Sequence, residues 1–440
     1  MTGRVRLSIV VAVLAFLVLR ASSVTMSAAD PEEPTEQRTD CAAVSVVAPS
    51  TVVSPAEQSL RFSDVWGLTR GAGQTVAVID TGVARHPLLP GAIAGGDFVS
   101  DGDGSTDCDA HGTVVAGLIA ARPSPGSGFV GGAPDADILT IRQSSSAFSA
   151  VSAERETRDD GSTSSGYGDV DSMALAVRAA VDAGAGVVNI SEVACAPVGT
   201  PLGDDALADA IEYAAVVKDA VIVVAAGNLD GSRCRDQNDT MRGQAGRDSP
   251  ATRTTASPAR FDDYVLTVGS LDADGTPSAF SLAGPWVDIA APGTDVTSLS
   301  PTGEGLADGT LDEEGRFSPF TGTSFATPFV SATAALVRSR YPDMSAREVI
   351  ARIVRTAHAP AGGWDSAVGF GSLDPVAAVT GTAEDEPENR PATRLDARVT
   401  TPPEDRSNAT VALVGSAGVI LALASLCFCA ALFDVKNRRE

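Results

Sequence analysis

The sequence predicts an α/β fold in which helices cover both faces of a mostly parallel sheet. Between residues 62 and 379, short apolar runs alternate with longer stretches that have helical composition, and no internal repeat is visible. Strands that are apolar throughout are typical of parallel sheets buried on both faces. Polar residues follow several of these runs, at the carboxyl ends where such sheets place their functional groups.

The predicted strands are short and apolar inside. They are TVAVID ending at Asp80, ADILTI ending at Ile141, GVVNIS ending at Ser191, AVIVVAAGN ending at Asn228, YVLTVGS ending at Ser270 and VDIAAPG ending at Gly293. The predicted helices cover residues 111–121, 170–183, 204–217 and 324–340. Long loops are expected at 143–168 and 230–258, where serine, glycine and charged residues replace any clear period.

One predicted helix begins in an unusual way, in the stretch GTSFATPF. Pro328 has no N–H to bond the carbonyl of Ser324, so it is tolerated only in the first turn. This places Ser324 at the helix N-terminus. A serine there can cap the helix, or it can act as a nucleophile where the helix dipole favours an oxyanion. The stretch alone leaves both open.

Both ends of the chain resemble targeting segments. Residues 1–29 contain basic residues, an apolar run and small residues, as a signal peptide does. Residues 410–433 are long and apolar enough for a transmembrane helix, and the basic tail at 434–440 should stay cytoplasmic. We therefore expect a single-pass protein of the cell membrane, with an extended arm at 30–60, an extracytoplasmic domain at 61–380 and a flexible linker at 381–409.

Composition restricts the partners and the redox setting. The net charge of −24 argues against nucleic acid as a partner, and the predicted anchor makes the lipid bilayer one. Of the six cysteines, four would be exported, where disulfides persist, and four cysteines allow three pairings.

A serine nucleophile needs a base and an orienting acid. The chain has three histidines. His86 and His358 stand in turns and are expected to be surface or packing residues, whereas His111 opens an apolar helix whose Gly112 and Gly117 permit close packing. Asp80 ends an apolar strand and must satisfy a buried charge. Aspartate in a turn is the other interpretation of Asp80.

The four blocks VIDTGV, HGTVVAGLIA, VVAAGN and GTSFATP, in this order, resemble the motifs of the subtilisin-like serine proteases. The resemblance covers residues 62–379. The stretches DCDAHGT, VVNISE and PARFDDYVLTVGS, together with the arm and the single anchor, resemble one branch, the mycosins of type VII secretion systems. The resemblance implies a subtilisin-like three-layer αβα fold.

The resemblance also implies residue roles. Ser324 would attack the scissile carbonyl, His111 would be the base and Asp80 would orient it. Asn228 would stabilise the oxyanion, although "GN" also makes a good turn. The segment comprising Asn189, Ile190 and Ser191 would wall the substrate pocket.

The disulfide pairs follow from the predicted sheet. Cys195 and Cys234 lie just beyond the strands that end at Ser191 and Asn228, so they can bond if those strands are neighbours. Cys41 is then left to bond Cys108, which would hold the arm beside His111.

No metal or cofactor is expected. The stretch DGDGSTDCDAHG has acids at alternate positions, but Thr106 and Gly112 stand where a calcium loop needs Gly and Glu. Many subtilisins bind calcium in an Asn-bearing loop after the histidine helix. In this chain that region reads ARPSPGSGFVGGAP and contains no Asn or Asp side chain. The arm is also too short to fold as an inhibitory pro-domain, so we expect it to wrap the domain and to be retained.

Two functions remain open. The first is an endopeptidase acting on exported proteins of a type VII secretion system. The second is a structural subunit that stabilises the secretion membrane complex, with proteolysis secondary.

Overall fold

The structure is a computed structural model that describes residues 33–48, 54–152, 166–229, 234–241 and 252–381. Residues from Pro387 onward form a second unit, which lies outside the described residues. The predicted signal peptide, linker, transmembrane helix and tail also lie outside them. Among the described helices, none has the length and apolar character needed to cross a membrane.

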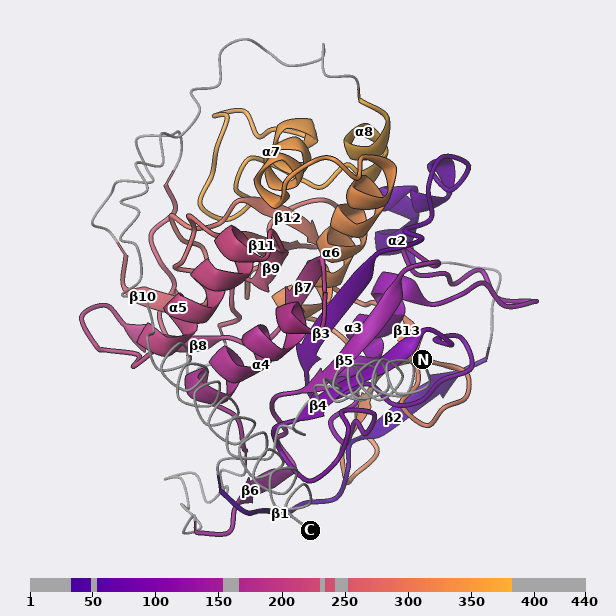
Figure 1. The fold of residues 1–440 in the computed structure, drawn as a ribbon, viewed down its shortest axis with the longest axis vertical. Helices are drawn as coiled ribbons and strands as arrows, with labels where there is room; N and C mark the ends of the chain where they lie inside the picture. The colour runs from indigo at the N-terminus through magenta and orange to yellow at the C-terminus, as the bar shows by residue number, and fades with distance from the viewer. Residues whose placement is uncertain (1–32, 49–53, 153–165, 230–233, 242–251, 382–440) are drawn as a thin grey trace, which may run out of the picture. The chain divides into compact units, whose positions relative to one another are not determined.

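A sheet of seven parallel strands forms the centre of the domain (Figure 1). Its spatial order is β12-β11-β9-β7-β3-β5-β4. The strands are β3 (Thr75–Asp80), β4 (Ala92–Asp97), β5 (Asp137–Arg142), β7 (Val187–Ile190), β9 (Val221–Ala225), β11 (Val265–Leu271) and β12 (Ile289–Pro292). The predicted parallel sheet is confirmed.

Alternate residues of the inner strands β3, β5, β7, β9 and β11 enter two separate cores. In β3, Val76 and Val78 pack with one apolar cluster, while Ala77 and Ile79 pack with the other. The first cluster includes α3 (His111–Ala120) and α6 (Thr323–Arg340), with α7 (Ala346–Thr356) and α8 (Pro375–Thr380) beside them. The second includes α4 (Val170–Asp182) and α5 (Asp205–Glu212). The domain therefore has three layers, αβα, as a sheet buried on both faces requires.

The predicted elements agree with the observed ones to within a few residues at their ends. Two differences have clear causes. The edge strand β4 was not predicted, because its sequence AIAGGD contains two glycines that weaken any strand pattern. The helix predicted over 204–217 changes to a π-helical turn at Tyr213–Val217, so its last part is not α-helical.

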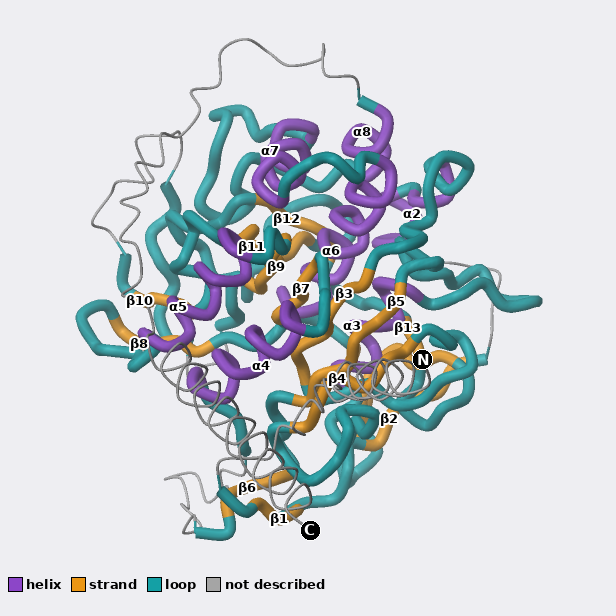
Figure 2. Tube along the Cα trace, in the orientation of Figure 1, coloured by secondary structure: helices purple, strands orange, loops and turns teal. Residues whose placement is uncertain are grey.

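The N-terminal arm adds strands to the domain instead of standing apart from it (Figure 2). Strand β1 (Thr35–Gln37) pairs with β6 (Phe148–Ala150), which belongs to the segment predicted as a loop. Strand β2 (Ala43–Val47) pairs with β14 (Leu306–Leu311), which also contacts β13 (Ser298–Leu299) and β15 (Phe317–Pro319). The arm ends in α2 (Pro55–Leu60), and a 3-10 turn, Phe62–Asp64, follows at the start of the domain.

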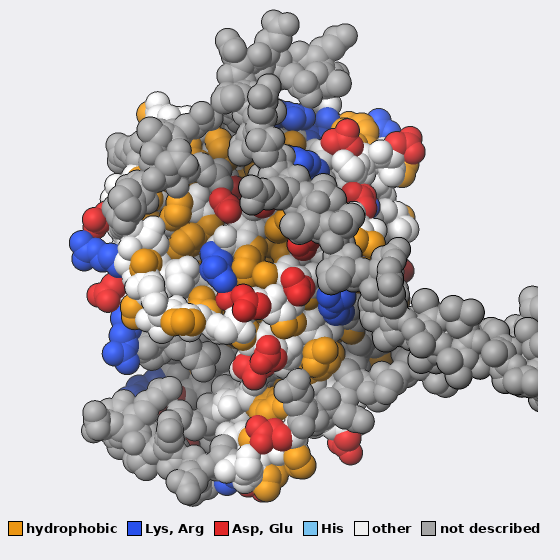
Figure 3. Space-filling view, turned by 60° about the vertical axis from the view of Figure 1, so that its left-hand side comes forward, with side chains coloured by type: hydrophobic (Ala, Val, Ile, Leu, Met, Phe, Trp, Pro, Cys, Tyr) orange, Lys and Arg blue, Asp and Glu red, His pale blue; other side chains and the backbone are white. Residues whose placement is uncertain are grey.

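A second small sheet joins β8 (Ala194–Pro197) to β10 (Thr254–Ser257) in antiparallel pairing. Figure 3 shows one face of the molecule, on which acidic and basic side chains are interspersed among apolar ones.

Candidate active site

Asp80 and His111 form a close pair at the carboxyl end of the sheet. Asp80 is the last residue of β3 and is fully buried, and His111 is the first residue of α3. Nδ1 of His111 lies 2.6 Å from Oδ1 of Asp80. Because a carboxylate oxygen accepts, the proton of a neutral imidazole is held on Nδ1 and Nε2 is left as the basic nitrogen.

Glycine lets α3 approach β3 this closely. A Cβ added to Gly112 would lie 2.1 Å from the carbonyl oxygen of Gly82 and 3.1 Å from Oδ1 of Asp80. A Cβ on Gly117 would lie 2.3 Å from Oγ of Ser298. The close packing expected of these two glycines is therefore observed.

Ser324 is the second residue of α6, so its predicted place at the helix N-terminus is confirmed. The prediction that Pro328 lies in the first turn is wrong, because Pro328 is the sixth residue of the helix. Ser324 is not the cap of the helix, because Gly322 occupies the N-cap position and no side chain makes a capping bond. The carbonyl of Ser324, which Pro328 cannot bond, accepts a hydrogen bond from the hydroxyl of Ser191 over 3.2 Å. The serine hydroxyl is therefore free of a capping role.

The amide of Asn228 is oriented by Thr323. Its Oδ1 accepts hydrogen bonds from the backbone N–H and the hydroxyl of Thr323, over 2.9 and 3.0 Å. The donor nitrogen, Nδ2, is thereby turned toward Gly322. A Cβ atom added to Gly322 would lie 3.2 Å from Nδ2 of Asn228 and 3.0 Å from Oγ of Ser324, so both groups lie close to this glycine. The sequence analysis missed Thr323, whose only signal is its place before Ser324 in the GTS stretch.

The ring of Phe325, in the first turn of α6, packs against the ring of His111. It lies 4.9 Å from the ring of His111 between centroids, and 5.4 Å from the ring of Phe320. Since Phe325 follows Ser324 directly, this contact brings His111 against the start of α6. The structure therefore brings together the side chains of Asp80 and His111, and it sets His111 beside the turn that carries Ser324.

The predicted pocket segment 189–191 ends β7 and continues beyond it. Asn189 and Ile190 are fully buried, and Asn189 bonds Ser191 and Ser331 over 2.8 Å each. Any contact of Asn189 or Ile190 with a substrate would therefore come from the backbone. A substrate-binding role for the segment stays a prediction.

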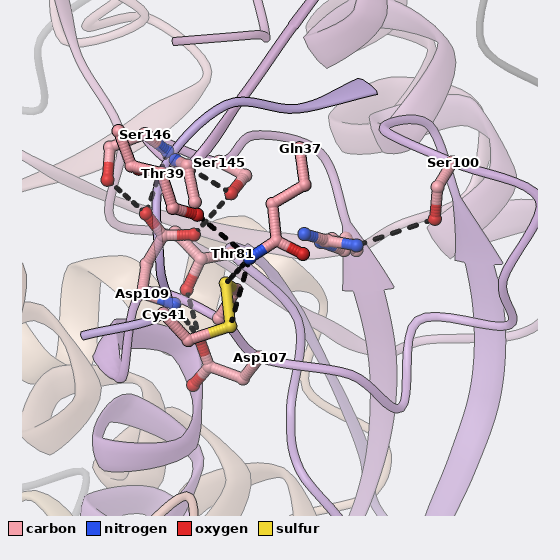
Figure 4. The surroundings of a disulfide bond; sticks show 12 residues. Gln37, Thr39, Cys41, Thr81, Ser100, Asp107, Asp109, Ser145 and Ser146 are labelled. Carbon is pink, nitrogen blue, oxygen red and sulfur yellow. Dashed lines mark hydrogen bonds between the residues drawn. A yellow bond between two sulfur atoms is a disulfide. The ribbon is translucent and has the colours of Figure 1, made fainter. Parts of the chain in front are cut away.

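A second, partly buried hydrogen-bond network is centred on Asp107, in the loop before α3 (Figure 4). Asp107 accepts hydrogen bonds from the hydroxyl of Thr81 over 2.9 Å and from the backbone and hydroxyl of Thr113 over 2.8 and 2.6 Å. Burial raises the pKa of Asp107 to about 6, although these hydrogen bonds oppose the rise. The network connects the strand that carries Asp80 to the first turn of the helix that carries His111.

Both disulfides have the predicted pairing. Cys41 is bonded to Cys108, three residues before His111, and the amide of Gln37 lies 3.7 Å from each sulfur (Figure 4). Cys195 is bonded to Cys234. The second disulfide lies close to the backbone next to Asn228. A Cβ atom added to Gly227 would lie 3.5 Å from the sulfur of Cys234 and 3.6 Å from that of Cys195.

The electrostatics of the site favour a charged imidazole. Burial acts to lower the pKa of His111, but the charges of Asp80, Glu192 and Asp107 outweigh it and raise the pKa to about 9. Glu192 was not singled out in the sequence, although it follows Ser191 directly.

One oxygen or nitrogen atom each from Asp80, His111 and Glu192 lie within 4.8 Å of one another. A cation could join them only by replacing the proton between His111 and Asp80. Because that pair is already hydrogen-bonded at 2.6 Å, we describe the three as a cluster of charges and not as metal ligands.

The other two histidines lie elsewhere. His86 is buried, and burial lowers its pKa. His358 is exposed and lies 3.1 Å from a carboxylate oxygen of Asp374.

Comparison with known proteins agrees with the resemblance seen in the sequence. The model of the Subtilase family matches residues 71–371. Mycosin-4 of Mycobacterium tuberculosis is 49% identical over 405 residues, which cover 89% of this chain and 85% of that protein.

Two solved structures are also similar. One is the MycP3 protease from the type VII (ESX-3) secretion system, with a TM-score of 0.74, 44% identity and coverage of 80% of this chain and 96% of that chain. The other belongs to the periplasmic assembly of the ESX-5 inner membrane complex, with a TM-score of 0.75, 39% identity and coverage of 86% and 96%. The chain is thus a subtilisin-like serine protease of the subtilase family, and within that family it belongs to the mycosins.

Proposed function

We propose that the chain is a serine endopeptidase in which Ser324, His111 and Asp80 form the catalytic triad. Ser324 attacks the scissile carbonyl while Nε2 of His111 takes its proton, and the same nitrogen returns the proton to the leaving amine. Asp80 holds the imidazole in the required tautomer and stabilises the imidazolium that forms. The acyl group on Ser324 is then released by water in a second round of the same steps.

Asn228 is proposed as the oxyanion donor. Negative charge develops on the carbonyl oxygen in the transition state, and a donor already aimed at that position stabilises it without reorganisation. Nδ2 of Asn228 and Oγ of Ser324 both lie near Gly322, on the same side of the turn. The backbone N–H of Ser324, at the start of α6, is the second donor.

The distance of 2.6 Å between His111 and Asp80 is the observation on which this proposal mainly rests. A buried carboxylate that holds a histidine and raises its pKa is an arrangement that clusters at functional sites. The test compares hydrolysis of a denatured protein substrate by the full chain and by Ser324→Ala. Serine-dependent cleavage supports the proposal, and equal cleavage by both proteins contradicts it.

We further propose that the domain is anchored outside the cytoplasmic membrane by residues 410–433 and works with a type VII secretion membrane complex. The support is the apolar composition of that segment and the similarity to the chain in the ESX-5 inner membrane complex. The full chain should stay in the membrane fraction after an alkaline wash, and a chain ending at residue 409 should not. Release of both chains by the wash would contradict the anchor.

The proposed substrates are exported proteins. New protein N-termini in the exported fraction should depend on Ser324 when wild-type cells are compared with cells that carry Ser324→Ala. An identical set of N-termini from the two strains would contradict this substrate class.

The alternative is a mainly structural subunit, which the relatives found in an assembled membrane complex favour. Deletion of the whole chain and Ser324→Ala distinguish the two functions. If secretion survives the point variant but not the deletion, the structural role dominates; if both abolish secretion, proteolysis is essential.

We also propose that the arm is a permanent part of the enzyme. Its strands β1 and β2 pair with strands of the domain, and the N–H of Ala42 bonds the carbonyl of Cys108 over 2.8 Å. The mature protein should keep Cys41. Clean loss of the arm together with a rise in activity would show that it is a removable inhibitor.

A further inference from the structure

Glu192 places a further carboxylate beside the catalytic pair. It follows Ser191, just past the end of β7, and it is half-buried. One of its carboxylate oxygens lies within 4.8 Å of a ring nitrogen of His111 and of a carboxylate oxygen of Asp80. A Ser-His-Asp triad works with one carboxylate beside the histidine. Here two carboxylates lie next to the imidazole.

Charged groups act on His111 from three separate segments. Strand β3 contributes Asp80, the loop before α3 contributes Asp107 and the segment after β7 contributes Glu192. The residue that contacts the ring from α6 is Phe325, which is uncharged. These three carboxylates raise the pKa of His111. The buried cation nearest in the sheet, Arg142, stands opposite Asp80 at the end of β5 and lies 3.5 Å from Asp97.

The three carboxylates differ in the groups to which they are bonded. Asp80 holds Nδ1 of His111 through the hydrogen bond of 2.6 Å. Asp107 is engaged by the hydroxyls of Thr81 and Thr113. Neither of these bonds involves Glu192, so neutralising Glu192 leaves both networks in place and removes one charge from the vicinity of the ring.

We propose that Glu192 is a positioning residue that acts through His111, its carboxylate lying within 4.8 Å of the ring and stabilising the imidazolium there. The catalytic consequence rests on the proposed function, because it requires His111 to be the base. The electrostatic part does not depend on any reaction.

Two effects of opposite sign follow for the reaction. In the free enzyme, Glu192 lowers the fraction of neutral His111 and therefore reduces activity near pH 7. Once the serine proton has moved, the same carboxylate stabilises the imidazolium and lowers the barrier. A weaker base gives a lower rate at full deprotonation. Neutralising Glu192 should therefore raise kcat/KM near pH 7 and lower its high-pH plateau, a pattern that a folding defect does not produce.

The direct test is a titration of the His111 ring by NMR in the full chain, purified in detergent and labelled at histidine. All proteins carry Ser324→Ala, so that self-cleavage is absent. The chain has three histidines, so three ring signals are expected, and His111→Gln identifies the relevant one. Glu192→Gln should lower the midpoint of His111 by about one pH unit, because an opposite charge at 4–6 Å favours the charged form.

The matched control is Glu314→Gln. This residue is exposed, pairs with Arg316 over 3.0 Å and gives the same change in net charge. It should leave the midpoint of His111 where it is in the parent protein. The inference is overturned if Glu192→Gln leaves the midpoint unchanged, or if Glu314→Gln lowers it equally. Absence of Ser324-dependent hydrolysis would contradict the proposed function alone, because the titration is read without turnover.

Discussion

The side-chain oxygen of Asn228 accepts two hydrogen bonds from Thr323, one from its backbone and one from its hydroxyl. The two residues are far apart in the sequence, and together they fix which end of the amide faces the turn before Ser324. Without the hydroxyl bond the amide is held by one bond only. The orientation of the proposed oxyanion donor therefore depends on a residue that is itself fully buried.

Thr323→Val should lower kcat roughly fivefold with little change in KM, because it removes a hydrogen bond of about 1 kcal/mol that orients a donor needed in the transition state. The control is Thr333→Val in the same helix, whose hydroxyl bonds only the carbonyl of Phe329. Steady-state kinetics on both variants decide the matter. An unchanged kcat for Thr323→Val, or an equal loss in the control, would contradict this role.

Gly112→Ala should reduce both stability and activity, because the new Cβ would lie 2.1 Å from a backbone oxygen of Gly82. Overpacking of this kind costs typically 1–3 kcal/mol, and relief requires α3 to move away from β3. Thermal unfolding and kcat/KM measure the two effects. Gly67→Ala, where no atom lies within 4 Å, should change neither. Wild-type values for Gly112→Ala would mean that α3 does not pack as described.

The activity of the wild-type protein should still be rising above neutral pH. The raised pKa of His111, about 9, means that the ring is mostly protonated at pH 7 and cannot accept the proton of Ser324. Below that pKa the neutral fraction grows about tenfold per pH unit, and kcat/KM should follow it. A plateau that is already complete at pH 7 would show that the charges around His111 act more weakly than the structure indicates.

His86 should make the fold sensitive to acid. Burial lowers its pKa below the ordinary value of 6.5, although a hydrogen bond to the backbone of Gly305 opposes this shift. Below pH 6.5, His86 therefore binds a proton more readily in the unfolded chain than in the folded chain. The free energy of unfolding then decreases as the pH is lowered, by at most about 1.4 kcal/mol per pH unit. His86→Gln should flatten this part of the stability curve. A curve with the same slope in both proteins would contradict the assignment.

The sequence predicted the layered fold because the strands are buried on both faces and therefore carry uninterrupted apolar runs. It also placed Asp80, His111 and Ser324 at element ends, which the structure confirms, and it predicted both disulfide pairs. Asn228 lies three residues beyond the end of β9, so the prediction that it ends the strand is wrong. Strand β4 was not predicted, because its glycines are not typical of a strand. Glycine is needed at position 95, since a Cβ atom there would lie 2.8 Å from atoms of β5. That requirement is visible only when the two strands are side by side.

The environment of the candidate site was harder to predict. Glu192 and Asp107 matter through their distance from His111, and they come from loops separated by many residues in the sequence. A charged residue in a loop is ordinarily solvated, so nothing in its own stretch indicates that it faces an imidazole. Thr323 is similar, since its effect on Asn228 depends on the meeting of β9 and α6.

The central claim is that His111 activates the hydroxyl of Ser324. The most direct measurement is labelling of the full chain with a fluorophosphonate at pH 8, followed by mass spectrometry of the peptides. The account predicts one adduct, on Ser324, that is lost in His111→Ala although that variant remains folded. An adduct on another residue, or labelling of Ser324 that His111→Ala leaves unchanged, would contradict it.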